Sequence, residues 1–144
     1  MSKSIFRKTA DVFQDIATIT ASLLNKAGIN VSNAWGKAQA PAWFAPAYAA
    51  NIDWNAGIYQ AAFALLSGNT TFNSPTNILP LATYILWVQQ DAVGGRTAAF
   101  GSTFKFSNGT APSLTNTPNG TDIFTFVASG SGLLYCVGQS KDIK

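Results

Sequence analysis

The sequence predicts a mainly β protein, in which a compact antiparallel β-sandwich or barrel-like domain follows an N-terminal helix and an extended arm. From residue 51 onward, short apolar runs alternate with Gly, Pro and Asn turn signals, a pattern typical of many short strands. A helical spacing of apolar residues occurs only before residue 28. We therefore divide the chain into a helix and aromatic arm over residues 1–50 and a β-domain over residues 51–144.

The N-terminal helix is predicted over residues 9–27. Apolar residues recur there at spacings of three, four and seven, as on one face of a helix: Val12, Phe13, Ile16, Ile19, Leu23 and Leu24. Thr9 can cap the start and Gly28 can end the helix. The many β-branched residues in this segment disfavour a helix, because they lose side-chain freedom in that conformation.

Residues 28–50 have no sustained period, and Pro41 and Pro46 interrupt any helix there. The segment carries four large aromatic side chains: Trp35, Trp43, Phe44 and Tyr48. Such side chains dominate the anchor positions of protein interfaces. We interpret the segment as an attachment arm whose aromatics bind a partner. The alternative is that these side chains pack on their own β-domain.

In the β-domain, the expected strands span residues 52–54, 59–66, 70–72, 84–88, 96–100, 122–128 and 133–137. The run 84–88 is apolar throughout, which suits a strand covered on both faces. Gly94 and Gly95 supply the freedom for a reversal, so residues 83–100 are predicted to form a hairpin with Leu86 and Val88 buried. The strands 122–128 and 133–137 are expected to pair across a turn. Arg96 is expected to pair with Asp91 or with a neighbouring subunit.

Ordered motifs in this region carry a resemblance. They are Ile-Asp-Trp at 52–54, Gly-Asn-Thr-Thr-Phe at 68–72, Tyr-x-Leu-x-Val-x-Gln-Asp-Ala-x-Gly-Gly-Arg-Thr at 84–97, Gly-Thr-Ala-Pro-Ser-Leu-Thr at 109–115 and Asp-Ile-Phe-Thr-Phe-Val at 122–127. Over residues 51–138 the chain resembles a β-domain recurrent in bacteriophage virion proteins, including tail fibres, head fibres and capsid-attached proteins. The resemblance implies a non-enzymatic structural protein of the virion, commonly a homotrimer.

The side-chain inventory offers little chemistry. The sequence has no His, no Glu and one cysteine, Cys136, which lies in an apolar run where a cysteine behaves as a small buried hydrophobe. The commonest general base and metal ligand are therefore missing. Asp53, Asp91 and Asp122 could converge on a cation, but lone Asp residues beside turns more often satisfy backbone donors. We predict no catalytic, cofactor-binding or metal-binding residue.

The amino-acid composition indicates which kinds of binding partner to expect. Of the residues, 47% are hydrophobic and 10% charged, against about 25% charged in typical soluble domains. So neutral a surface suggests subunit contacts, although a compact neutral monomer is the alternative. The net charge of +3 forms no basic stripe, so no specific nucleic-acid binding is expected. No membrane span and no secretory signal are visible, so the protein is expected to be made in the host cytoplasm and assembled into the virion.

Two functions from the virion class compete. We favour a capsid decoration (cement) protein that binds the major capsid protein, because a fibre normally needs a long shaft between its ends. The alternative is a short tail fibre or tail-tip subunit that binds a host receptor or surface glycan, on which Trp54 or Trp87 could stack. A third hypothesis, a polysaccharide-cleaving enzyme, would need an acidic groove that six Asp residues barely supply.

Overall fold

The computed structural model describes residues 12, 14–20, 22 and 40–144 of the chain. Contacts divide the chain into two units, Met1–Ala40 and Pro41–Lys144, and we call the second the β unit. The β unit therefore starts at Pro41, whereas the sequence pattern placed the start of the β-domain at residue 51.

Apart from Ala40, the described part of the first unit is helical, as predicted: residues 12, 14–20 and 22. The Oγ1 atoms of Thr18 and Thr20 donate hydrogen bonds to the carbonyl oxygens of Gln14 (2.9 Å) and Ile16 (2.8 Å), so these β-branched side chains are satisfied within the helix. Both ends of the predicted helix 9–27 lie outside the described residues. Within the part of the chain that the structure describes, no helix has both the length and the apolar character needed to cross a membrane.

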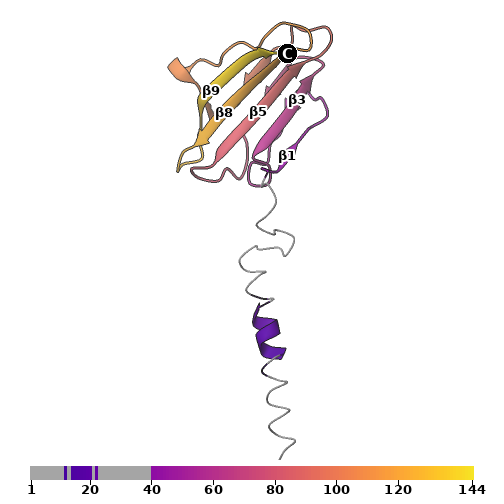
Figure 1. Ribbon diagram of the computed structural model, residues 1–144. Coiled ribbons are helices and arrows are strands. Elements are labelled where there is room, and N and C mark those ends of the chain that lie inside the picture. Colours follow the sequence, from indigo (N-terminus) through magenta and orange to yellow (C-terminus); the bar gives the residue numbers. More distant parts are fainter. Residues whose placement is uncertain (1–11, 13, 21, 23–39) are drawn as a thin grey trace, which may run out of the picture. The chain divides into compact units, whose positions relative to one another are not determined.

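The β unit is built from two sheets (Figure 1). Its strands are β1 (Trp43–Phe44), β2 (Asn51–Ile52), β3 (Ala61–Leu66), β4 (Thr70–Phe72), β5 (Thr83–Gln90), β6 (Ala98–Phe100), β7 (Phe104–Lys105), β8 (Thr121–Ala128) and β9 (Leu134–Ile143). A six-stranded sheet of order β1-β3-β5-β8-β9-β7 curls into a half-barrel, and the second sheet has the order β2-β4-β6. A short 3₁₀ helix, η1 (Ser107–Gly109), follows β7. The predicted mainly β, barrel-like fold is confirmed.

The chain winds between the two sheets as it proceeds. Odd-numbered β1, β3 and β5 lie parallel in the large sheet, and even-numbered β2, β4 and β6 lie parallel in the small one. Only the pairs β5–β8 and β8–β9 are antiparallel, the latter across the turn that the sequence predicted. The strand pairing is therefore mixed, not antiparallel throughout.

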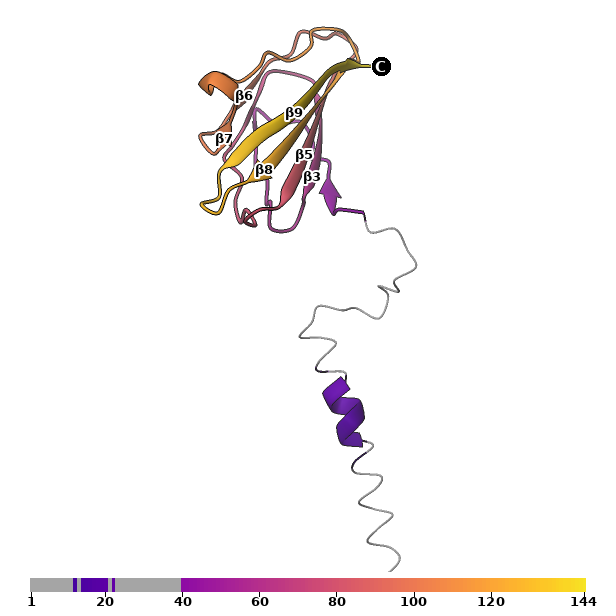
Figure 2. The ribbon, with the colours of Figure 1, turned by 60° about the vertical axis from the view of Figure 1, so that its left-hand side comes forward.

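The predicted hairpin over residues 83–100 is wrong. Strand β5 pairs with β3 on one side and β8 on the other, while β6 pairs with β4 in the small sheet. Gly94 and Gly95 do adopt positive φ, 76° and 73°, but the turn carries the chain across to the other layer. There the Phe100 ring packs edge-on against Phe124 with ring centroids 5.8 Å apart, so burial of this aromatic residue is achieved between the sheets. Figure 2 shows β6 and β7 to the left of β9, where β7 forms the edge of the large sheet.

The hydrophobic core lies between the two sheets. Leu86 and Val88 are buried there, as predicted, together with Tyr84 from the same strand. Alternate residues of β5 point the other way, and Trp87 remains 45% exposed. The expectation that β5 is covered on both faces is therefore wrong for the single chain, because the small sheet covers only the inner face of the large one.

Candidate interaction surface

The uncovered face of the large sheet carries exposed apolar side chains, and we call it the outer sheet face. Strand alternation and register place these side chains on it: Phe63, Leu65, Ile85, Trp87, Ile123, Val127 and Tyr135. Between them lie the neutral side chains of Thr83, Gln89, Thr121 and Thr125. The face therefore presents bulky apolar groups, and its positions on β3, β5 and β8 carry no formal charge. Lys105 of β7 pairs with Tyr135 and places one positive charge at the β9 side of the face.

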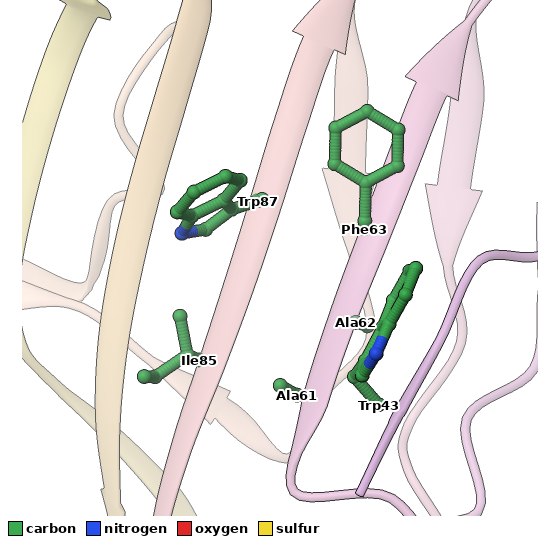
Figure 3. A pocket seen from close by; sticks show the side chains of 6 residues that line it. All are labelled: Trp43, Ala61, Ala62, Phe63, Ile85 and Trp87. Atoms are coloured by element: carbon green, nitrogen blue, oxygen red, sulfur yellow. The ribbon is translucent and has the colours of Figure 1, made fainter. Parts of the chain in front are cut away.

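A hollow of about 470 Å³ crosses one side of this face, and we call it the apolar groove. Its lining residues are Trp43, Ala61, Ala62, Phe63, Ile85 and Trp87 (Figure 3). Register explains the shape. Ala61 lies between Trp43 and Ile85 across neighbouring strands, so a small residue forms the floor between larger ones. The only polar side-chain atoms in the lining are the two indole nitrogens.

The structure separates the four aromatic residues that the sequence predicted to bind a partner. In β1, Trp43 lines the groove and is 63% exposed, whereas Phe44 points inward and stacks on Tyr59 with ring centroids 5.1 Å apart. Tyr48 is also largely exposed, and its hydroxyl donates a 3.1 Å hydrogen bond to the carbonyl oxygen of Asn69. Trp35 lies outside the described residues. Opposite orientations of Trp43 and Phe44 follow from the two-residue period of a strand.

The loop after β5 is held by an ion pair that the sequence predicted. The Arg96 guanidinium donates from Nε (3.1 Å) and Nη2 (2.8 Å) to Oδ2 of Asp91. The other carboxylate oxygen of Asp91 accepts hydrogen bonds from the backbone N–H groups of Val93 and Gly94. The hydrogen bonds from Arg96, followed by those from the backbone, lower the pKa of Asp91 below its ordinary value. Both side chains are thus engaged in shaping this loop.

The other candidate acids serve different loops. Asp122 is buried, and its two oxygens accept from the backbone N–H groups of Thr115 (2.7 Å) and Asp142 (3.0 Å). Asp53 accepts from the side-chain amide of Asn73. Across residues 12, 14–20, 22 and 40–144, no three His, Cys, Asp or Glu side chains gather in a way that could hold a metal ion. Convergence of the three Asp residues on a cation is therefore not found.

Trp54 and Cys136, which the sequence also singled out, have side chains that pack within the β unit. Trp54 is buried, and its indole N–H donates to the carbonyl oxygen of Tyr59 (2.8 Å), so it cannot present a ring to a sugar. Cys136 is partly buried against the core, as its apolar neighbours indicated, and burial raises the pKa of its thiol. Of the two tryptophans on which a glycan could stack, Trp54 and Trp87, only Trp87 lies on an accessible surface.

Comparison with known families decides where this β unit belongs. The family model described as "Putative phage tail fibre C-terminal domain" matches residues 52–133, more than half of the chain. The chain belongs to this phage tail fibre domain family. Membership confirms the resemblance to phage virion proteins and makes the chain a virion component. No curated protein and no solved structure gives a significant match to the chain.

The phage tail fibre domain coincides with most of the β unit. The matched range begins in β2 and ends in the turn before β9, so it includes Phe63, Ile85 and Trp87 of the groove. Trp43 and Tyr135 lie outside it. The sequence pattern did not lead us to expect Phe63 and Ile85 on an exposed surface. The available signal was that runs 61–66 and 84–88 are apolar at both odd and even positions, more than one buried face requires.

Proposed function

We propose that the protein is a non-enzymatic fibre subunit of the phage tail, assembled as a homotrimer, whose β unit contacts a receptor or glycan on the host surface. Membership of the tail fibre domain family carries the proposal. A core filled by packed aromatic rings supports it, since a domain at an exposed position on a virion must keep its shape.

The state of the acidic side chains supports a non-enzymatic role. Acid catalysis on a polysaccharide needs two carboxyl groups facing the same bond. In the β unit, Asp53, Asp91 and Asp122 accept hydrogen bonds at three separate places, from Asn73, from the loop after β5, and from Thr115 and Asp142 respectively. Their hydrogen-bonding capacity is used to hold turns, which is the structural role of such residues beside strands.

Capsid decoration, which the sequence analysis favoured, is the second candidate. The outer sheet face favours it, because a decoration protein needs an uncharged surface that capsid subunits can cover. The fibre proposal ranks first since the matched family is one of tail fibre domains.

Location on the particle distinguishes these two functions. Phage particles would be labelled with gold-conjugated antibodies against the chain and imaged by electron microscopy. We expect label at the tail only. Label over the whole head would refute the fibre proposal and support decoration.

Adsorption tests the host-binding part. Purified full-length chain, added to host cells before the phage, is expected to slow adsorption, with heat-denatured chain as the control. Tail labelling without any competition would refute the receptor-binding role while leaving the fibre assignment in place.

A further inference from the structure

The outer sheet face has the composition of a buried surface but is open in the single chain. Strands β3 and β5 carry apolar residues on both faces, a pattern characteristic of strands covered on two sides. The small sheet accounts for the inner face alone. Leu65 and Trp87, facing outward from these strands, remain 48% and 45% exposed. A second layer is therefore needed to complete the burial that the sequence encodes.

The polarity and charge of the outer sheet face indicate which kind of partner fits it. A glycan is held by a few well-placed polar groups around an aromatic platform, but the apolar groove offers only two indole N–H groups. A phosphate-bearing or acidic partner would require basic side chains, and the outward positions of β3, β5 and β8 carry none. A second copy of this chain brings the same apolar face, whose positions on β3, β5 and β8 carry no charge that could be buried unpaired. The charge of Lys105 lies at the edge strand β7, where it can stay in contact with water.

The exposed area is sufficient for such a contact. Trp43, Leu65, Trp87 and Tyr135 are 63%, 48%, 45% and 47% exposed. With about 200 Å² for a large side chain, these four groups alone expose on the order of 400 Å². A stable interface covers about 800 Å² on each partner. The half-buried Ile123 and Val127 and the remaining groove residues lie on the same face and contribute toward the remainder.

We propose that copies of this chain assemble through the outer sheet face, with Tyr135 of one copy seated in the apolar groove of the next. The groove lies over β1, β3 and β5, whereas Tyr135 projects from β9 beside Val127, two strands beyond β5. A hollow and a projection on one face can meet either in a reciprocal two-fold contact or in a head-to-tail contact, and the proposed homotrimer requires the head-to-tail contact, which closes into a ring. The inference rests on the proposed homotrimer and names its interface.

Self-association of the full-length chain tests the surface. Sedimentation equilibrium at micromolar concentration is expected to show a trimer for the wild type and a monomer for Trp87→Lys and for Tyr135→Asp. Trp87→Lys buries an unpaired charge, and Tyr135→Asp replaces the ring that fills the apolar groove by a carboxylate. Leu81→Asp is the control: it adds a charge at a residue that is 79% exposed on the loop before β5, with a φ of 59° that Asp tolerates, and it should remain a trimer. Circular dichroism must show that each variant is folded. If Trp87→Lys does not fold, Tyr135→Asp decides.

Combining the two substitutions tests the pairing. In a head-to-tail ring, the double variant Trp87→Lys, Tyr135→Asp places opposite charges together at every contact, so the trimer should return. Monomeric single variants without rescue in the double variant would overturn the groove-to-Tyr135 contact. Trimeric single variants would overturn the surface itself.

The remaining outcomes separate this inference from the proposed function. A monomeric wild type whose Trp87→Lys variant no longer competes for host adsorption would show that a receptor covers the face, and would overturn the inference. A monomeric wild type whose antibody label lies at the tail would refute the inference and leave the fibre assignment intact. A trimer whose antibody label lies over the head would support the inference and refute the fibre assignment.

Discussion

Replacing Gln90 by Leu should detach the loop after β5 from the core. Gln90 is the last residue of β5, and its side chain is almost completely buried. Its amide forms a two-point contact with the backbone of Arg96: Nε2 donates to the carbonyl oxygen (2.9 Å), and Oε1 accepts from the N–H (2.8 Å). The side chain thereby links the large sheet to the segment that enters β6 of the small sheet.

The expected cost follows from these two hydrogen bonds. Each contributes about 0.5–1.5 kcal/mol net, and leaving a partly buried donor or acceptor of Arg96 without a partner costs about 1–3 kcal/mol more. Because water can reach part of this loop, we expect Gln90→Leu to lower the free energy of unfolding by about 2–4 kcal/mol. The leucine fills a similar volume, so the loss should come from hydrogen bonding and not from a cavity.

Urea unfolding followed by tryptophan fluorescence measures this loss. Protein concentration must be equal in all samples, because self-association adds to the apparent stability. The matched control is Gln89→Leu on the same strand, whose more exposed amide donates a single 3.3 Å hydrogen bond to Asn119. It should change the unfolding free energy by less than about 0.5 kcal/mol. Equal unfolding midpoints for the two variants would refute the assigned role of Gln90.

Three further changes test the core, a buried acid and the loop ion pair. Leu86→Ala should cost about 2–5 kcal/mol in the same urea assay, and an unchanged midpoint would show that β5 is not a core strand. Asp122→Asn should cost about 1–3 kcal/mol, because one amide oxygen cannot replace the two carboxylate oxygens that accept from Thr115 and from Asp142 of β9; Asp53→Asn, at an exposed position, is the control. Since the pKa of Asp91 is lowered, its stabilising contribution is present above its ordinary pKa of 3.8 and is lost as the pH falls below that value. Arg96→Gln should remove this part of the acid sensitivity, and an unchanged dependence of the urea midpoint on pH would contradict the assignment.

Local features of the fold could be predicted from the sequence. The strands at 70–72 and 122–128 and the turn at 129–132 depend on alternation and on turn residues that lie within the segment itself. The pairing of Arg96 with Asp91 could also be anticipated, because the two residues flank a short glycine-containing turn. Burial of Leu86 and Val88 followed from the apolar character of their strand.

The choice of strand partners could not be predicted in the same way. Whether β6 returns beside β5 or crosses to β4 depends on the burial of Phe100 against Phe124, a contact between residues distant in the sequence. Strand β1 contains two residues and follows Pro41, so no periodic signal marks it. The apolar groove was hidden for the same reason, because its floor and walls come from β1, β3 and β5, which become neighbours only in the folded sheet.

The winding of the chain between two parallel stacks has a consequence for synthesis on the ribosome. Strand β5 pairs with β3 as soon as both are present, but its other edge is matched only by β8, after thirty further residues have been added to the chain beyond Gln90. During that interval an apolar strand offers unpaired backbone groups to other nascent chains, a known route to aggregation. We expect the length of the segment between β6 and β8, which contains β7 and η1, to set how long this exposure lasts. The hairpin of β8 and β9 is then the element that ends it, because its pairing with β5 covers the edge.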